Sequence, residues 1–144
     1  MARTSPSAYA SASNSLGVPP ARLAHLTDDE YASLVRRRGE LIDSALAELR
    51  ERVPAARAYT AAQLDATVSD LGHIVDFLAA AVYVDDASLF SEFVEWLSGI
   101  LSSRGVPVGA IALPLEHYAA ALRDFPRAAR TLALGSAALL GMPR

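Results

Sequence analysis

The sequence predicts an all-α protein, and three observations lead to that class. Apolar residues recur three, four or seven positions apart through several segments, as on one face of a helix. Polar caps, prolines and glycines separate these segments, and no useful stretch alternates with the period of a strand. With 144 residues, 52% of them apolar, the chain is long enough for one domain with a real core.

Two parts are expected along the chain: a flexible N-terminal arm over residues 1–25 and a single helical domain over residues 26–144. The arm is rich in Ser and Ala, and Pro19-Pro20 closes it. It contains no apolar stretch of the kind that a secretory signal needs, so a cytoplasmic location is the default expectation.

The first helix of the domain is expected to run unbroken from Thr27 to Val53. In the sequence TDDE, Thr27 can cap the helix while Glu30 reaches back to it. The apolar stripe then continues through Leu34, Leu41 and Leu49, and Pro54 stops the helix.

Four further helices follow from similar signals. A capping box at Thr60–Gln63 opens a helix that Asp85-Asp86 ends, and the same pair can cap the next helix, which closes at Gly105 in a left-handed conformation. The last two helices begin with prolines in their first turns. The signals for these two are Pro107, followed by an expected kink or irregular turn at Pro114, and then Pro126.

Composition argues against several classes of function. The chain has no cysteine, which excludes disulfides, thiolate ligands and thioether-linked groups. Its net charge is −3, and the one basic run, Arg36–Arg38, lies on a charge-balanced helix, so no nucleic-acid partner is expected. No apolar run approaches the ~18–20 residues that cross a bilayer, so no membrane association is expected either.

Sequence motifs for catalysis are also missing. There is no phosphate-binding glycine loop, zinc-binding His-Glu pair or nucleophile elbow. The three histidines are scattered along the chain, and none has a second ligand four residues away. The sequence therefore predicts a protein that is not an enzyme and binds no metal.

The most informative segment is TVSDLGHIVDFLAAAVYVDD, residues 67–86, because an apolar helix carries polar residues in its middle turns. Thr67, Asp70, His73 and Ile74 are spaced to share one side of that helix. Two interpretations remain open: Asp70 and His73 are half-exposed boundary residues, or Asp70 faces a groove and accepts N–H bonds from a flat ligand.

A longer stretch around this segment resembles the central part of the phycobiliproteins, which are globin-like, bilin-carrying proteins. The run Asp70–Asp76 (DLGHIVD) is similar to the motif that follows their chromophore-bearing Cys, and Ser103–Val108 (SRGVPV) is similar to a later turn. The resemblance covers roughly residues 60–122. It implies a globin-like helical domain with a shortened N-terminal extension.

Departures from that pattern favour a non-antenna relative, similar to the bilin biosynthesis-associated globins. Thr67 stands where the attachment Cys would be, Ser69 replaces the propionate-binding Arg, and Asp70 keeps the residue that holds the pyrrole nitrogens. The resemblance therefore implies non-covalent binding of a linear tetrapyrrole such as biliverdin, or assistance to a bilin reductase. The site that it implies consists of Asp70, Thr67, Ser69, His73, Ile74, Phe77 and Phe93.

Two other functions remain as alternatives. A haem globin needs a proximal His, and Ala87–Arg104 contains none, which leaves His73 as a single candidate ligand. A ligand-free sensory or scaffolding globin would act as a homodimer through an aromatic interface. Trp96 distinguishes these interpretations, because it is expected in the core unless it belongs to a partner surface.

Overall fold

The computed structural model describes residues 28–141, and this part of the chain contains helices and no strand. The all-α prediction is therefore confirmed. The six α-helices are α2 (Asp29–Arg36), α3 (Arg38–Arg52), α4 (Ala61–Val84), α5 (Ala87–Ser103), α6 (Val108–Ala121) and α7 (Pro126–Leu139), and a 3-10 helix, η3 (Pro54–Ala58), joins α3 to α4.

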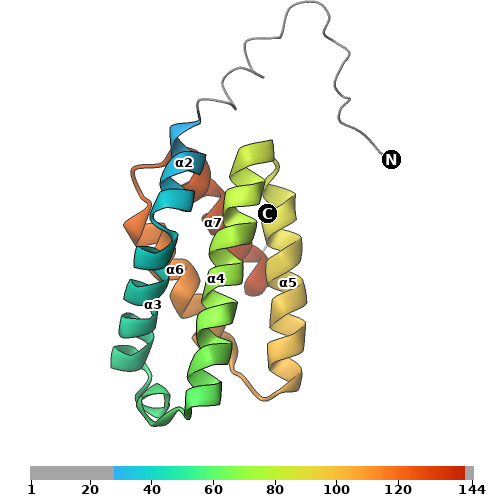
Figure 1. The fold of residues 1–144 in the computed structure, drawn as a ribbon. Coiled ribbons are helices and arrows are strands. Elements are labelled where there is room, and N and C mark those ends of the chain that lie inside the picture. The colour runs from blue at the N-terminus through green and yellow to red at the C-terminus, as the bar shows by residue number, and fades with distance from the viewer. Residues whose placement is uncertain (1–27, 142–144) are drawn as a thin grey trace, which may run out of the picture.

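The helices form two layers with α4 at the centre of one of them. In Figure 1, α2 continues into α3 on one side of α4, and α5 lies on the other side. Helix α4 runs antiparallel to both neighbours, and α6 and α7 lie behind this layer. Helix α4 packs against α2, α3, α5 and α7, while α6 packs against α3 and α7. These contacts close a ring of helices around one hydrophobic core.

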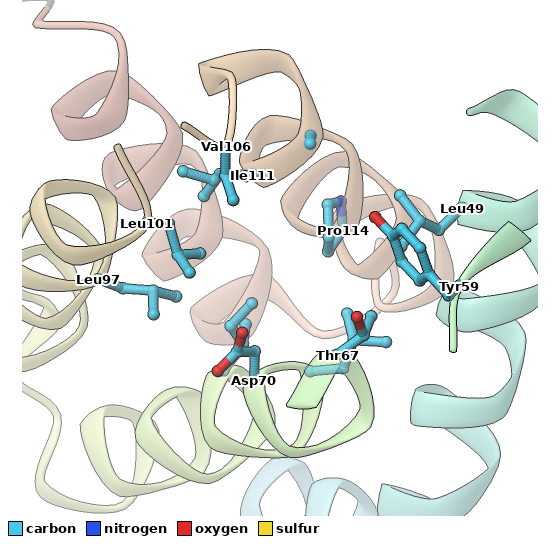
Figure 2. Close-up of a pocket in the computed structure, with 12 residues that line it drawn as sticks. Leu49, Tyr59, Thr67, Asp70, Leu97, Leu101, Val106, Ile111 and Pro114 are labelled. Atoms are coloured by element: carbon cyan, nitrogen blue, oxygen red, sulfur yellow. The ribbon is translucent and has the colours of Figure 1, made fainter. Parts of the chain in front are cut away.

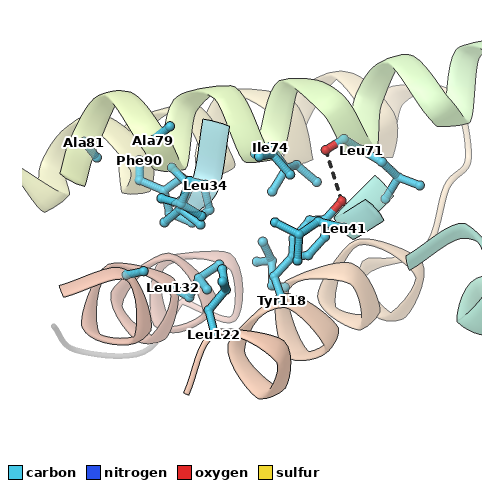
Figure 3. Close-up of a cluster of buried hydrophobic side chains, with 14 of the residues drawn as sticks. Leu34, Leu41, Leu71, Ile74, Ala79, Ala81, Phe90, Tyr118, Leu122 and Leu132 are labelled. Carbon is cyan, nitrogen blue, oxygen red and sulfur yellow. Dashed lines mark hydrogen bonds between the residues drawn. The ribbon is translucent and has the colours of Figure 1, made fainter. Parts of the chain in front are cut away.

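The core draws buried side chains from all six α-helices (Figure 3). The largest fully buried side chains include Leu34, Leu41, Leu78, Phe90, Leu115, Tyr118 and Leu132. The hydroxyl of Tyr118 in α6 donates a hydrogen bond to the carbonyl oxygen of Leu71 in α4 at 3.2 Å. Burial raises the pKa of the Tyr118 phenol well above its usual value of 10.0, so the hydroxyl keeps its proton as a donor.

The expected unbroken first helix is wrong, because the chain forms two helices that meet at Arg37. This residue ends α2 and begins α3 with φ −95° and ψ 8°. Two residues further on stands Gly39, which disfavours continuous helix because of its backbone freedom. Thr27 lies outside the described residues, and Asp28 is the residue whose side chain caps α2.

Glu30 does not close a capping box in its own helix but caps α7 instead. Its carboxylate accepts the backbone N–H groups of Ala128 at 3.0 Å and Arg127 at 3.3 Å. Helix α7 receives no cap from its own N-cap residue, so these donors need an acceptor from elsewhere. The Arg127 side chain pairs with Asp28 and Glu30 and donates to the carbonyl of Val82 at 3.2 Å. One ion-pair network thus joins α2, α4 and α7.

Most of the other expected helix boundaries are confirmed. The capping box at Thr60 opens α4, the Asp86 side chain caps α5, Gly105 has φ +82°, and Pro126 is in the first turn of α7. One proline prediction needs correction, because Pro107 is the N-cap of α6 and not its first-turn residue. At Pro114 the helix continues without an irregular turn, and the alternative expectation of a kink there stays a prediction.

Helix α4 is also long and apolar enough, by length and composition, to cross a bilayer. It has 24 residues, and an 18-residue stretch of it has a mean hydropathy of 1.3 and is 44% buried inside the molecule. The helix contains no unbroken apolar run because its polar residues are spread along it. A core helix satisfies the same criterion, so this observation is weak evidence for a membrane span.

The close approach of α5 and α7 gives a first prediction. A Cβ atom added at Gly135 would lie 2.5 Å from Cε2 of Phe90, so Gly135→Ala forces the ring out of its buried place. We expect this variant to lose about 1–3 kcal/mol in the free energy of unfolding, measured by urea denaturation. The matched control is Gly99→Ala in α5, where nothing lies within 4 Å of the new Cβ. The control should gain up to about 1 kcal/mol, and equal effects at both positions would contradict the packing argument.

The network around Arg127 gives a second prediction. Burial alone would raise the pKa of Asp28, but hydrogen bonds from Arg127 and two backbone N–H groups hold it below 3.8. Arg127→Met leaves the partly buried carboxylates of Asp28 and Glu30 without a counter-ion, and we expect a loss of about 1–3 kcal/mol at pH 7. Because the folded-state pKa is depressed, the stability from the network is present above pH 3.8 and lost as pH falls through the folded-state pKa.

Between pH 2 and pH 7, the melting temperature of this variant should depend less on pH than that of the wild type. Arg130→Met on the same helix is the control, because its side chain is exposed. Equal stability of the two variants at pH 7 would contradict a structural role for the network.

Candidate functional site

A small cavity lies between α4, α5 and α6 (Figure 2). It offers about 100 Å³ of interior space, which is less than the 150 Å³ or so that holds a benzene ring in an engineered cavity. Its walls are apolar apart from the side chains of Thr67 and Asp70 in α4 and the hydroxyl of Tyr59 at the end of η3. The lining residues are Leu49, Tyr59, Thr67, Asp70, Leu71, Ile74, Leu97, Leu101, Val106, Ala110, Ile111 and Pro114.

Asp70 is the polar group that sets the chemistry of this cavity. Burial raises the pKa of its carboxyl, and the nearby charges of His73 and Arg104 only partly oppose that effect. Within residues 28–141 the carboxylate has no hydrogen-bond partner, whereas the Thr67 hydroxyl donates to the carbonyl of Gln63 at 2.8 Å. The cavity therefore contains an unpaired acceptor that favours a donor or a positive charge.

The opposite wall contains a proline inside a helix. Pro114 lies inside α6 and lines the cavity together with Ala110. Because proline has no N–H, the carbonyl of Ala110 lacks the donor that a continuous helix would give it.

A second, more open groove lies on the outer side of α4 and α5. It offers about 440 Å³ and is lined by His73, Phe77, Leu89, Glu92, Phe93 and Trp96. The rings of Phe77 and Phe93 stack with centroids 4.1 Å apart, and the ring of Trp96 lies 6.1 Å from Phe93. Phe77 is 41% exposed and Trp96 is 61% exposed, so the groove presents aromatic faces to solvent.

The cavity and the groove both border the contact between α4 and α5, which we call the seam, and they share no lining residue. Asp70 and Phe77 are seven residues apart, which is about two turns or ~10 Å along one side of α4. On α5, Phe93 lines the groove and Leu97, one turn further on, lines the cavity.

The predicted site residues divide between the two places. Thr67, Asp70 and Ile74 line the cavity, and His73, Phe77 and Phe93 line the groove. Ser69 is exposed and lines neither. His73 lies toward the groove, one turn from Asp70, and its charge acts on the Asp70 carboxylate.

Several residues of the site were not predicted from the sequence. Tyr59, Leu101 and Pro114 come from η3's end, α5 and α6, and nothing in their local sequence distinguishes them from core residues. Arg104, at the end of α5, is close enough to act on the charge of Asp70. Trp96 was expected in the core, and its exposure of 61% overturns that expectation.

No known protein-family model and no curated protein matches this sequence. The resemblance to phycobiliprotein-like globins therefore stays a prediction. Among residues 28–141, no group of three or more His, Asp or Glu side chains is placed to hold a metal ion.

The burial of Asp70 gives a third prediction, on stability without any ligand. Because the folded-state pKa is raised, ionisation of Asp70 destabilises the fold as pH rises from 3.8 through that raised pKa. We expect Asp70→Asn to be slightly more stable than the wild type at pH 7 and equal to it below pH 3.8. Urea midpoints at several pH values measure the difference.

Asp65→Asn serves as the control for this prediction. Asp65 is exposed on the same helix, so its variant should show no such pH-dependent gain. An Asp70→Asn protein less stable than the wild type at pH 7 would show that the carboxylate has a stabilising partner.

Proposed function

We propose that this chain is a globin-like protein that binds a linear tetrapyrrole without a covalent bond, along the seam between α4 and α5. The observation that carries the proposal is the half-buried carboxylate of Asp70, which has no hydrogen-bond partner within residues 28–141 and lines a largely apolar cavity, with an aromatic groove further along α4 and α5. The sequence resemblance around residues 60–122 names the tetrapyrrole as the class of ligand.

The chemistry of Asp70 suits the protonated form of such a ligand. A cationic tetrapyrrole carries several N–H groups, and a carboxylate can accept two of them in charge-assisted hydrogen bonds. In exchange, the positive ligand lowers the pKa of Asp70, which burial has raised. Affinity should therefore fall as the pH is lowered through the raised pKa of Asp70.

The shape of the seam favours an extended ligand over a compact one. The cavity of about 100 Å³ is too small for four rings, and ligand sites for molecules of that size usually measure ~300–1,000 Å³. The groove of about 440 Å³ supplies the remaining room, and its aromatic rings can stack on the ligand's pyrrole rings. A linear tetrapyrrole placed along the seam would use both.

Arg104 offers a partner for a propionate group. Ser69 stands where the resemblance would place the propionate-binding Arg, and Ser69 is exposed away from the cavity. Arg104 comes instead from the end of α5, and its positive charge acts on Asp70. A guanidinium at this end of the seam can bind a carboxylate in a bidentate manner.

Biliverdin binding tests the proposal, and the single tryptophan of the chain provides the signal. Trp96 lines the groove, so a ligand in the seam should quench its fluorescence. At micromolar protein, we expect biliverdin to quench the fluorescence of Trp96. We also expect the long-wavelength absorption band of biliverdin to shift to the red and to sharpen. Asp70→Asn should weaken binding by about ten-fold, since a charge-assisted hydrogen bond contributes ~1.5–3 kcal/mol.

Asp65→Asn is the matched control, because it removes a carboxylate from the exposed side of the same helix. Its affinity for biliverdin should equal that of the wild type. The proposal is wrong if neither fluorescence nor absorption changes at micromolar protein, or if Asp65→Asn and Asp70→Asn lose the same affinity.

The exposed aromatic side chains favour a second candidate, a ligand-free module that dimerises. Phe77 and Trp96 leave apolar surface open to solvent on the outer side of α4 and α5. In a homodimer this surface would be covered by the partner. Light scattering that shows a dimer disrupted by Trp96→Ala, together with no response to biliverdin, would support this candidate over the first.

A further inference from the structure

Away from the seam, a Ser, a His and a Glu form a chain of hydrogen bonds between α3 and α6. The Ser44 hydroxyl lies 2.7 Å from Nε2 of His117, and Nδ1 of His117 lies 2.5 Å from a carboxylate oxygen of Glu48. Ser44 and Glu48 are one turn apart on α3, which places both beside the imidazole. None of the three residues lines the cavity or the aromatic groove.

The proton positions follow from the partners. A carboxylate only accepts hydrogen bonds, so Nδ1 of His117 must carry a proton that it donates to Glu48. In the neutral imidazole, Nε2 is then free to accept from the Ser44 hydroxyl. The Leu41 carbonyl is a competing acceptor for that hydroxyl at 3.3 Å, but Nε2 is nearer at 2.7 Å.

This order of atoms is the one that activates a serine nucleophile. The base contacts the hydroxyl through one ring nitrogen, and a carboxylate orients the base through the other. Glu48 is itself held, because its second carboxylate oxygen accepts from Arg52 at 3.0 Å. The His117 side chain is only 17% exposed, while Ser44 is exposed and within reach of a substrate.

An open surface groove borders the three residues. It offers about 670 Å³, and its lining includes Ser44, Glu48, His117 and two arginines, Arg50 and Arg57. The Arg57 side chain donates to the carbonyls of Arg50 and Glu51 at 2.7 and 2.8 Å, which fixes it at the end of α3. A guanidinium beside the groove can stabilise negative charge on a substrate oxygen.

We propose that Ser44, His117 and Glu48 form a hydrolytic site for small carboxylic esters, contrary to the sequence-based expectation that the chain is not an enzyme. Ser44 Oγ forms a bond to the ester carbonyl carbon, and its proton passes to Nε2 of His117. The bond to the alcohol oxygen breaks, and His117 returns the proton to that alcohol. Water then cleaves the acyl-serine by the same steps and releases the carboxylic acid.

Hydrolysis of p-nitrophenyl acetate by the full chain tests this proposal. We expect turnover above the buffer rate, with kcat/KM reduced about 100-fold in Ser44→Ala and in His117→Gln, the lower range for general acid–base catalysis. Glu48 acts as a positioning residue, so Glu48→Gln should lower kcat and leave KM unchanged. Ser102→Ala, an exposed serine at the end of α5, should keep the wild-type rate.

A covalent probe separates this site from ester cleavage by a lone imidazole. Diisopropyl fluorophosphate should modify Ser44, as seen by peptide mass spectrometry, and His117→Gln should abolish the adduct. Melting temperatures of all variants show whether a lost rate reflects unfolding. A folded Ser44→Ala protein with the full rate, or a folded wild type without an adduct on Ser44, would overturn the proposal and leave a structural tie between α3 and α6.

Discussion

The hydrogen bond from Tyr118 to the Leu71 carbonyl is the constraint on which both candidate sites depend. Tyr118 is fully buried, and its raised pKa keeps the hydroxyl proton available as a donor. A buried phenol without a partner would cost free energy, so α6 must present this residue to α4 at one rotation and one height. Leu71 in turn lies one residue after Asp70, so the same contact fixes α6 beside the cavity.

That rotation of α6 determines what its neighbouring residues face. Pro114 and Ile111, one and two turns before Tyr118, lie on the same side and form the cavity wall. His117 precedes Tyr118 by one residue, which turns it about 100° away and toward α3, where Ser44 and Glu48 lie. The contact between Tyr118 and Leu71 thus places apolar residues of α6 near Asp70 and the imidazole of His117 beside the Ser44 hydroxyl. The two sites share no residue.

The sequence was sufficient for most helix ends, because those depend on local signals, but not for the break at Arg37 that divides α2 from α3. The Thr60 capping box, the Asp86 cap and Gly105 each act within one turn, and all three hold in the structure. Long-range contacts were not predictable in this way. Glu30 had the spacing of a local cap, yet its carboxylate serves α7, 97 residues further along the chain. His117 similarly meets Ser44 across 73 residues, and the spacing of neither residue indicates the other.

The polar residues in the middle of α4 can now be separated by what each one contacts. Asp76 forms a two-pronged ion pair with Arg38 at 2.7 and 3.1 Å, while Ser69 and His73 are exposed to solvent. The polar side chain of Asp76 thus has a partner within the chain, and those of Ser69 and His73 are exposed to water. Asp70 is different, since it is half-buried against apolar walls and has no hydrogen-bond partner within residues 28–141. An apolar residue at this position would avoid the cost of burying the carboxylate, and the proposed tetrapyrrole ligand would offset that cost by donating to Asp70.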